Sequence, residues 1–271
     1  MNQKKKDMMN VFTSSARPTP PNALTASWTF AGRALLKIKH VPEQLFDITA
    51  FPVIFLLMYT YLFGGAIAGS PGEYLQYLLP GILAMTVVMI TMYTGIDLNK
   101  DVTKGVFDRF RTLPVWLPSV LVGAMLVDAV RYTVASTIMV SLGLVLGFRP
   151  EGGFIGVLTA VGLLIIFSVS LSWIWTMLGL IMRSERSLMG VSMMVMFPLT
   201  FMSNAFIDPN TLPSWLQGFV EWNPISILVS AIRGLMHGVD VANDIWLTCI
   251  ISVAFTAIFA PITMALYRKK K

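Results

Sequence analysis

Long apolar stretches with few or no charges alternate with short polar segments along this chain. A bilayer core of roughly 30 Å requires about 20 apolar residues for each helical span. Six stretches have this character, and they predict spans at about residues 46–68, 75–96, 120–146, 154–182, 188–207 and 245–267. The pattern therefore indicates an all-α integral membrane protein with six transmembrane helices.

Lys and Arg residues cluster in alternate connections between these stretches, and at both chain ends. Because such residues are retained on the cytoplasmic side of a membrane, we expect both termini in the cytoplasm and a multi-pass protein of the plasma membrane. Charged residues make up 13% of the chain, against about 25% in a soluble domain. The net charge of +6 lies along one membrane face without interleaved aromatics, so no nucleic-acid partner is expected.

Two segments precede the first span. Residues 1–23 are polar and contain Pro18, Pro20 and Pro21, so we expect a disordered cytoplasmic tail. Residues 24–41 place apolar side chains at helical spacing with cations on the opposite side. They predict an amphipathic helix that lies on membrane lipids, with a soluble helix packed on a partner as the alternative.

Residues 97–113 predict a second cytoplasmic helix, which follows the second span. The segment mixes charges of both signs, Gly105 interrupts it and Pro114 ends it. A solvated loop has no need of Phe107 and Phe110, whereas aromatic side chains beside charges are typical of protein interfaces. We interpret the segment as a docking surface for another protein, with a solvated loop as the alternative.

Residues 208–244 form a long connection before the last span. The apolar run within it, Ile225–Ile232, is too short to cross a bilayer, and Trp215 and Trp222 stand nearby. Irregular backbone at membrane depth is tolerated where protein or water covers it, and Trp is enriched at membrane interfaces. We therefore expect a re-entrant or interfacial helical hairpin on the outer face, anchored by the two Trp side chains.

Several short motifs, in this order along the chain, resemble those of type-2 ABC exporter permeases. They are Lys104-Gly105-Val106-Phe107-Asp108-Arg109-Phe110-Arg111-Thr112-Leu113-Pro114, Val122-Gly123-Ala124-Met125-Leu126-Val127-Asp128-Ala129-Val130-Arg131-Tyr132, Phe206-Ile207-Asp208-Pro209, Leu212-Pro213-Ser214-Trp215-Leu216, Asn223-Pro224 and Arg233. The first two are most similar to the daunorubicin-resistance-type permeases, and the resemblance extends from about Leu24 onward. Lys104 departs from the family, whose members often carry Glu there, so individual ion pairs with a partner are not transferred.

The resemblance implies a transport subunit without its own ATPase. A separate ABC ATPase would bind ATP and Mg²⁺, while this chain would bind no cofactor and would pair with a second copy or a close paralogue. Residues 24–41 would be the elbow helix, 97–113 the coupling helix, and 208–244 the cap over the exit. The exported cargo would be a hydrophobic or amphipathic drug, antibiotic or lipid-like compound, with a polysaccharide or glycolipid as the alternative.

The residues themselves agree that this chain is not an ATPase. A phosphate-binding loop ends in Gly-Lys-Ser/Thr, and no Gly-Lys pair occurs in the sequence. His40 and His237 are expected on opposite membrane faces, which excludes a metal site shared between them.

Candidate functional residues fall into three groups. For docking on the ATPase we select Lys104, Gly105, Phe107, Asp108, Arg109, Phe110, Arg111 and Pro114. For a translocation path, with interhelical packing as the alternative, we select Met85, Met89, Met92, Met193, Met196 and Asn204. For structural or gating roles we select Asp128, Arg131, Pro213, Trp215, Asn223, Pro224 and Arg233.

Two of these predictions are more specific. Asp128 and Arg131 stand three residues apart, so they share a helix face and should form an ion pair near the inner interface. Arg233 and Glu221 should brace the outer hairpin.

Two other protein classes compete with this interpretation. Asp97 with Asp101, and Asp240 with Asp244, have the spacing of the paired acidic motifs of intramembrane prenyltransferases. The charge topology, however, places the two pairs on opposite sides of the membrane. An ion-driven secondary transporter would carry a carboxylate at mid-span and internal repeats, and the chain shows neither.

Overall fold

A computed structural model describes residue 32 and residues 42–105 and 119–269, and every element in these ranges is helical. The elements are α3 (Pro42–Met58), the π-helix η1 (Tyr59–Phe63), α4 (Gly64–Ala68), α5 (Pro71–Ile90), α6 (Met92–Thr103), α8 (Ser119–Leu146), α9 (Gly153–Ile181), α10 (Glu185–Phe201), the 3-10 helix η2 (Pro209–Thr211), α11 (Ser214–Trp222), α12 (Pro224–His237) and α13 (Ala242–Lys269). The predicted tail, the predicted elbow helix and residues 106–118 lie outside the described residues.

Five helices in the described ranges are long and apolar enough to cross a membrane. They are Ala50–Ala68, Pro71–Thr103, Ser119–Leu146, Gly153–Ile181 and Ala242–Lys269. The predicted fifth span, at 188–207, is instead the 17-residue helix α10, which ends at Phe201. Integral membrane character and the all-α class are confirmed, while the count of six spans stays a prediction.

The second span is longer than its predicted range of 75–96. It runs as one apolar stretch from Pro71 to Thr103, with a break at Thr91 between α5 and α6. Residues 97–103 therefore continue this span, and the expected start of a separate helix at residue 97 is wrong. Two of the charged residues in this stretch have partners on neighbouring helices, Asp97 on α8 and Lys100 on α10.

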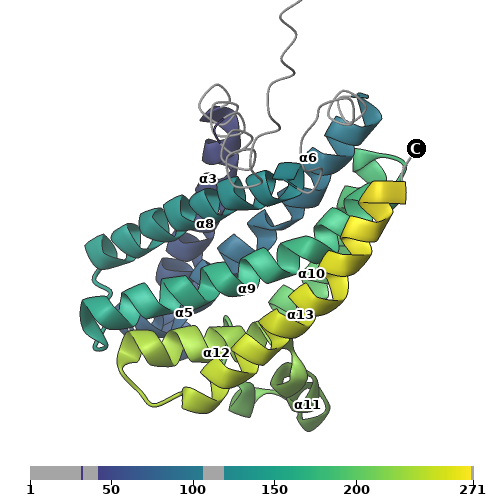
Figure 1. The fold of residues 1–271 in the computed structure, drawn as a ribbon. Helices are drawn as coiled ribbons and strands as arrows, with labels where there is room; N and C mark the ends of the chain where they lie inside the picture. Colours follow the sequence, from purple (N-terminus) through teal and green to yellow (C-terminus); the bar gives the residue numbers. More distant parts are fainter. Residues whose placement is uncertain (1–31, 33–41, 106–118, 270–271) are drawn as a thin grey trace, which may run out of the picture.

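The long helices run side by side in alternating directions, forming a tilted bundle (Figure 1). The start of α3, the end of α6 and the end of α13 lie at one end of the bundle, and α11 and α12 lie at the other (Figure 1). Helix α9 packs against α6, α8, α12 and α13. The segment that holds Asp240 and the end of α6 that holds Asp97 are thus far apart, which agrees with the argument against a shared acidic site.

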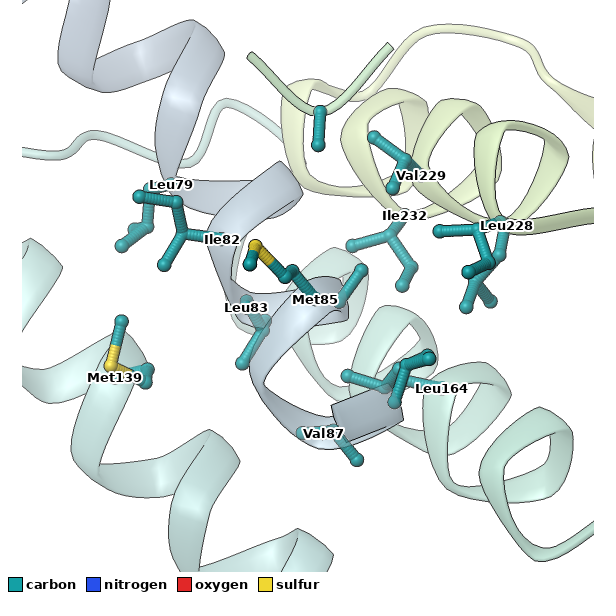
Figure 2. Packing of buried hydrophobic residues seen from close by; sticks show 14 of the residues in the cluster. Leu79, Ile82, Leu83, Met85, Val87, Met139, Leu164, Leu228, Val229 and Ile232 are labelled. Carbon is teal, nitrogen blue, oxygen red and sulfur yellow. The ribbon is translucent and has the colours of Figure 1, made fainter. Parts of the chain in front are cut away.

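The core is built around α5. The apolar window of the second span is 83% buried, whereas that of α13 is 11% buried, so α5 is central and α13 peripheral. Figure 2 shows Leu79, Ile82 and Leu83 of α5 among side chains of three other helices. Those side chains are Met139 of α8, Leu164 of α9, and Leu228, Val229 and Ile232 of α12. The peripheral helices leave apolar side chains exposed, as helices facing lipid do.

Candidate functional site

The end of α6 forms the base of the predicted docking segment. Lys104 caps the helix and Gly105 has a left-handed φ of 69°, which favours glycine and ends the helix there. Both residues lie at the exposed end of the helix. The other predicted docking residues, Phe107 to Arg111 and Pro114, lie outside the described residues.

Helix α6 is joined to α9 and α10 just before that segment. The Asn99 amide donates to the carbonyls of Gly179 and Met182, at 2.9 and 2.8 Å. One residue further on, Lys100 forms an ion pair with Glu185, the first residue of α10, at 3.5 Å. A displacement of the docking segment would therefore be transmitted to the ends of two other helices.

A buried polar cluster lies between α6, α8 and α9. Arg131 donates to Asp128 at 3.0 Å, which confirms the pairing predicted from their spacing, and also to Asp97 of α6 at 3.3 Å. Thr94 donates to the second oxygen of Asp128 at 2.7 Å. On the far side of the cluster, Tyr132 shares a hydrogen bond of 2.8 Å with Ser172 of α9. Hereafter these six residues (Thr94, Asp97, Asp128, Arg131, Tyr132 and Ser172) are called the polar cluster.

The polar cluster pairs charges that would be costly to bury singly. A charge inside a membrane protein is costly unless it is paired, and the Asp128 and Arg131 side chains are only 6% and 10% exposed. Asp97 adds a second carboxylate at 26% exposure. The Asp128–Arg131 pair is predictable from the sequence because both residues lie on one helix. The contact of Arg131 with Asp97 joins two helices, so the sequence does not predict it.

Arg233 joins three segments at the opposite end of the bundle. Its guanidinium donates to the carbonyls of Tyr77 and Asn204, at 3.2 and 2.9 Å, and lies 3.8 Å from the centre of the Tyr77 ring. Burial lowers the pKa of the Arg233 guanidinium from its ordinary value, although an arginine in a protein keeps its proton. Arg233, one of the two residues predicted to brace the hairpin, contacts Tyr77 and Asn204, whereas the other, Glu221, is exposed.

Asn204 takes part in the same contacts as Arg233 and does not line an open translocation path within the subunit. Its backbone carbonyl also accepts a bond of 3.0 Å from the Tyr77 hydroxyl, and its side chain donates to Ser230 at 2.7 Å. The residue is 6% exposed. These bonds replace helical ones, which explains why α10 ends before residue 204.

The hairpin predicted before the last span consists of η2, α11 and α12. Pro213 precedes α11, and Pro224 occupies the first turn of α12, where its missing N–H leaves no donor unpaired. Trp215 and Trp222 are 73% and 86% exposed, so both remain free to contact lipid, as the predicted anchoring requires.

Asn223 holds the hairpin against α10. Its side-chain oxygen accepts from the N–H of Ile225 at 2.9 Å and caps α12, while its amide donates to the carbonyls of Leu199 and Met202, at 2.7 and 3.2 Å. One side chain thus starts α12 and satisfies carbonyl groups at the end of α10.

Asn223→Ala is expected to lower the thermal unfolding midpoint of the detergent-solubilised protein. The change removes a helix cap and leaves two carbonyls without their donor, a loss of about 1–3 kcal/mol. Asn210→Ala is the matched control, because the Asn210 side-chain amide donates to the carboxylate of Asp208 and both residues are exposed. Equal midpoints for the two variants would show that Asn223 has no structural role.

The methionines selected for a path divide into two sets. Met85, Met92 and Met196 are buried in the core of the subunit, at 6%, 4% and 2% exposure, and Met89 packs against that core. Met193 is 40% exposed on α10. The first set thus matches the interhelical packing given as the alternative, and Met193 alone of these residues lies on an open face.

Gln76 connects two further segments, and no sequence pattern predicts this contact. Its amide donates to the carbonyl of Gly147 at 3.1 Å, and its side-chain oxygen accepts from the N–H of Arg149 at 2.9 Å. The Nε2 atom of His237 lies 3.0 Å from the Gln76 carbonyl oxygen, so His237 is tied to a backbone group. Within residues 42–105 and 119–269, no group of three His, Cys, Asp or Glu side chains could hold a metal ion.

Comparison with known proteins adds an independent line of evidence. The family model described as ABC-2 type transporter matches residues 25–237. A daunorubicin resistance ABC transporter permease protein, DrrB1 of Streptomyces coeruleorubidus, is 49% identical over 97% of this chain and 93% of its own length. A probable doxorubicin resistance ABC transporter permease protein, DrrC of Mycobacterium tuberculosis, is 25% identical over 80% of this chain and 82% of its own length.

Proposed function

This chain belongs to the ABC-2 type transporter family, and on that premise we propose that it is the membrane subunit of an ATP-driven exporter of amphipathic drugs. The observation that supports the cargo is the 49% identity to a daunorubicin resistance permease over 97% of the chain. Identity of this extent covers the membrane helices and their connections alike. A polysaccharide or glycolipid exporter is the alternative cargo class.

A separate ABC ATPase supplies the energy in this proposal. The chain has no Gly-Lys pair for a phosphate-binding loop, so ATP and Mg²⁺ are bound by the partner. The docking segment begins at Lys104, directly after the helix turns whose side chains bond α9 and α10. Closure of the ATPase would therefore move several helices together.

Two copies of the chain, or this chain and a close paralogue, enclose the path in this proposal. Helix α5 lies at the centre of the subunit, and its side chains are packed in the subunit's own core. This packing favours a path between subunits over a path within one subunit. Apolar side chains on α10, including Met193 and Phe197, are exposed and available to a second copy or to lipid. We place the fifth of the six predicted spans at α10, because the exposed face of this helix is apolar.

The proposed activity is tested by transport in a drug-sensitive bacterial strain and then in proteoliposomes. The chain is expressed with its ABC ATPase, and the efflux of a fluorescent anthracycline is followed. We expect ATP-dependent efflux that is lost when the ATPase carries an inactive Walker A motif, with the proton gradient intact. Efflux that follows the proton gradient instead would contradict the proposal, and export of labelled glycolipid without drug efflux would favour the alternative cargo.

Phe107→Ala with Phe110→Ala is expected to weaken copurification of the ATPase by at least tenfold. Aromatic anchors at the centre of an interface each contribute about 2 kcal/mol or more. The amount of ATPase recovered with the tagged permease measures the effect. Phe154→Ala is the control, because Phe154 is 80% exposed at the start of α9, far from the end of α6. Unchanged recovery with the double variant would argue for the solvated-loop alternative.

A further inference from the structure

Helix α6 is attached to α9 through close backbone contacts. A Cβ atom added at Gly95 would overlap the carbonyl oxygen of Trp175, and one added at Gly179 would lie 2.5 Å from the carbonyl oxygen of Gly95. Small residues permit such close approach between membrane helices. The amide of Asn99 and the indole N–H of Trp175, which donates to Thr91 at 2.9 Å, add buried hydrogen bonds along the same seam.

The attachment of α6 to α8 has a different character. It consists of side-chain contacts, in which Thr94 and Asp97 of α6 reach Asp128 and Arg131 of α8. Side chains can rotate to follow or release a neighbouring helix, whereas closely packed backbones have fewer ways to adjust. Helix α6 can therefore move more readily against α8 than against α9.

The charges are arranged so that release of the α8 contact is tolerated. Arg131 keeps its shorter bond, 3.0 Å, to Asp128 of its own helix when α6 moves away. Asp97, at 26% exposure, is the most exposed of the three charged groups and lies closest to the end of α6, where water can hydrate it. The hydroxyl of Thr94 can turn to a carbonyl of its own helix. Opening this contact leaves no unpaired charge in the deep part of the polar cluster, and the neutral Tyr132–Ser172 hydrogen bond between α8 and α9 opens with it.

From this asymmetry we infer that α6 and α9 move as one rigid unit, and that the Asp97–Arg131 pair is a latch to α8 that opens during the transport cycle. Asp97 and Arg131 are thus positioning residues, which set how movement of the docking segment reaches the third span. The inference rests on the proposed function, because it requires a partner ATPase that moves the end of α6.

Distances between spin labels test the inference on the full complex with its ATPase. The chain's single cysteine, Cys249, is first replaced by alanine. One pair of labels joins exposed positions on α6 and α9, Thr103 and Ile181, and a second pair joins α6 and α8, Thr103 and Leu126. We expect the α6–α8 distance to shift by about 2 Å or more on ATP binding, while the α6–α9 distance stays constant.

A variant series separates the latch from a merely structural role. Asp97→Asn should shift the nucleotide-free complex towards the ATP-bound α6–α8 distance, by up to about fivefold in population for a partly exposed pair, whereas Asp97→Glu should restore the parent distribution. Lys100→Gln is the matched control, since it removes the Lys100–Glu185 ion pair between α6 and α10 and leaves the latch intact.

The outcomes are distinguishable from those of the proposed function. Equal shifts in both label pairs, or no shift in either pair in a complex that transports drug, would overturn the latch and leave the exporter standing. An Asp97→Asn distribution identical to that of the parent would also overturn it. A chain that assembles with no ATPase and transports no drug would refute the exporter proposal and, with it, the latch.

Discussion

Arg131→Gln is expected to remove most of the folded protein from the membrane fraction. The Arg131 guanidinium lies 3.3 Å from Asp97 and 3.0 Å from Asp128, and its side chain is 10% exposed. Without it, two carboxylates face the same interior space with no cation. Removing one partner of a buried pair costs about 3–5 kcal/mol, a large part of the roughly 5–15 kcal/mol that stabilises a folded protein. The yield of monodisperse protein after detergent extraction, and its unfolding temperature, measure the loss.

A neutral version of the polar cluster serves as the rescue for this variant. The triple variant D97N/D128N/R131Q carries no charge there, and hydrogen bonds between amides can replace the ion pairs, so much of the yield should return. Lys100→Gln, which breaks a pair whose side chains are 32% and 39% exposed, should unfold within about 1 kcal/mol of the parent. An unfolding temperature for Arg131→Gln equal to the parent's would mean that the cluster contributes nothing to stability.

Gly95→Val should separate α6 from α9 and abolish ATP-dependent transport. The new Cβ would meet the carbonyl group of Trp175, whose carbon lies 2.7 Å away, and backbone atoms cannot turn aside as a side chain can. Overpacking of this kind typically costs 1–3 kcal/mol, to which the strained Asn99 and Trp175 hydrogen bonds would add. Drug efflux in proteoliposomes, together with the unfolding temperature, reports the effect.

Gly162→Ala is the control for the glycine prediction. Gly162 also lies in a transmembrane helix, α9, but nothing lies within 4 Å of the Cβ that alanine would add. Alanine is a better helix former by up to about 1 kcal/mol, so this variant should be neutral or slightly stabilised. If Gly95→Val transported drug as well as Gly162→Ala does, the α6–α9 seam would not be rigid.

Local features of the candidate sites were predictable from the sequence. The Asp128–Arg131 pair follows from a spacing of three residues on a helix, and the structure confirms it at 3.0 Å. The hairpin before the last span follows from the short apolar run with its flanking Pro and Trp residues, and the structure forms α11 and α12 there.

Features that join distant segments were not predictable. Asp97, Asn99 and Gln76 find their partners on other helices, 34, 80 and 71 residues away in sequence, and one sequence holds no signal for such pairs. The expected boundary at residue 97 was wrong for the same reason. Charged residues predict the end of an apolar span, whereas Asp97 and Lys100 have partners on α8 and α10 and the helix runs on to Thr103.

The hydropathy pattern by itself determined that the protein is helical and lies in a membrane, because a bilayer admits only segments that satisfy their own backbone hydrogen bonds. The alternation of charge likewise predicted which ends share a side of the membrane. The tertiary structure decided which helix is central, which charges are paired, and how α6 meets its neighbours. It contacts α9 through closely packed backbones and α8 through side chains. Those properties depend on where side chains from different helices meet, and membrane helices select their neighbours by close packing and buried polar contacts rather than by the hydrophobicity that defines each span.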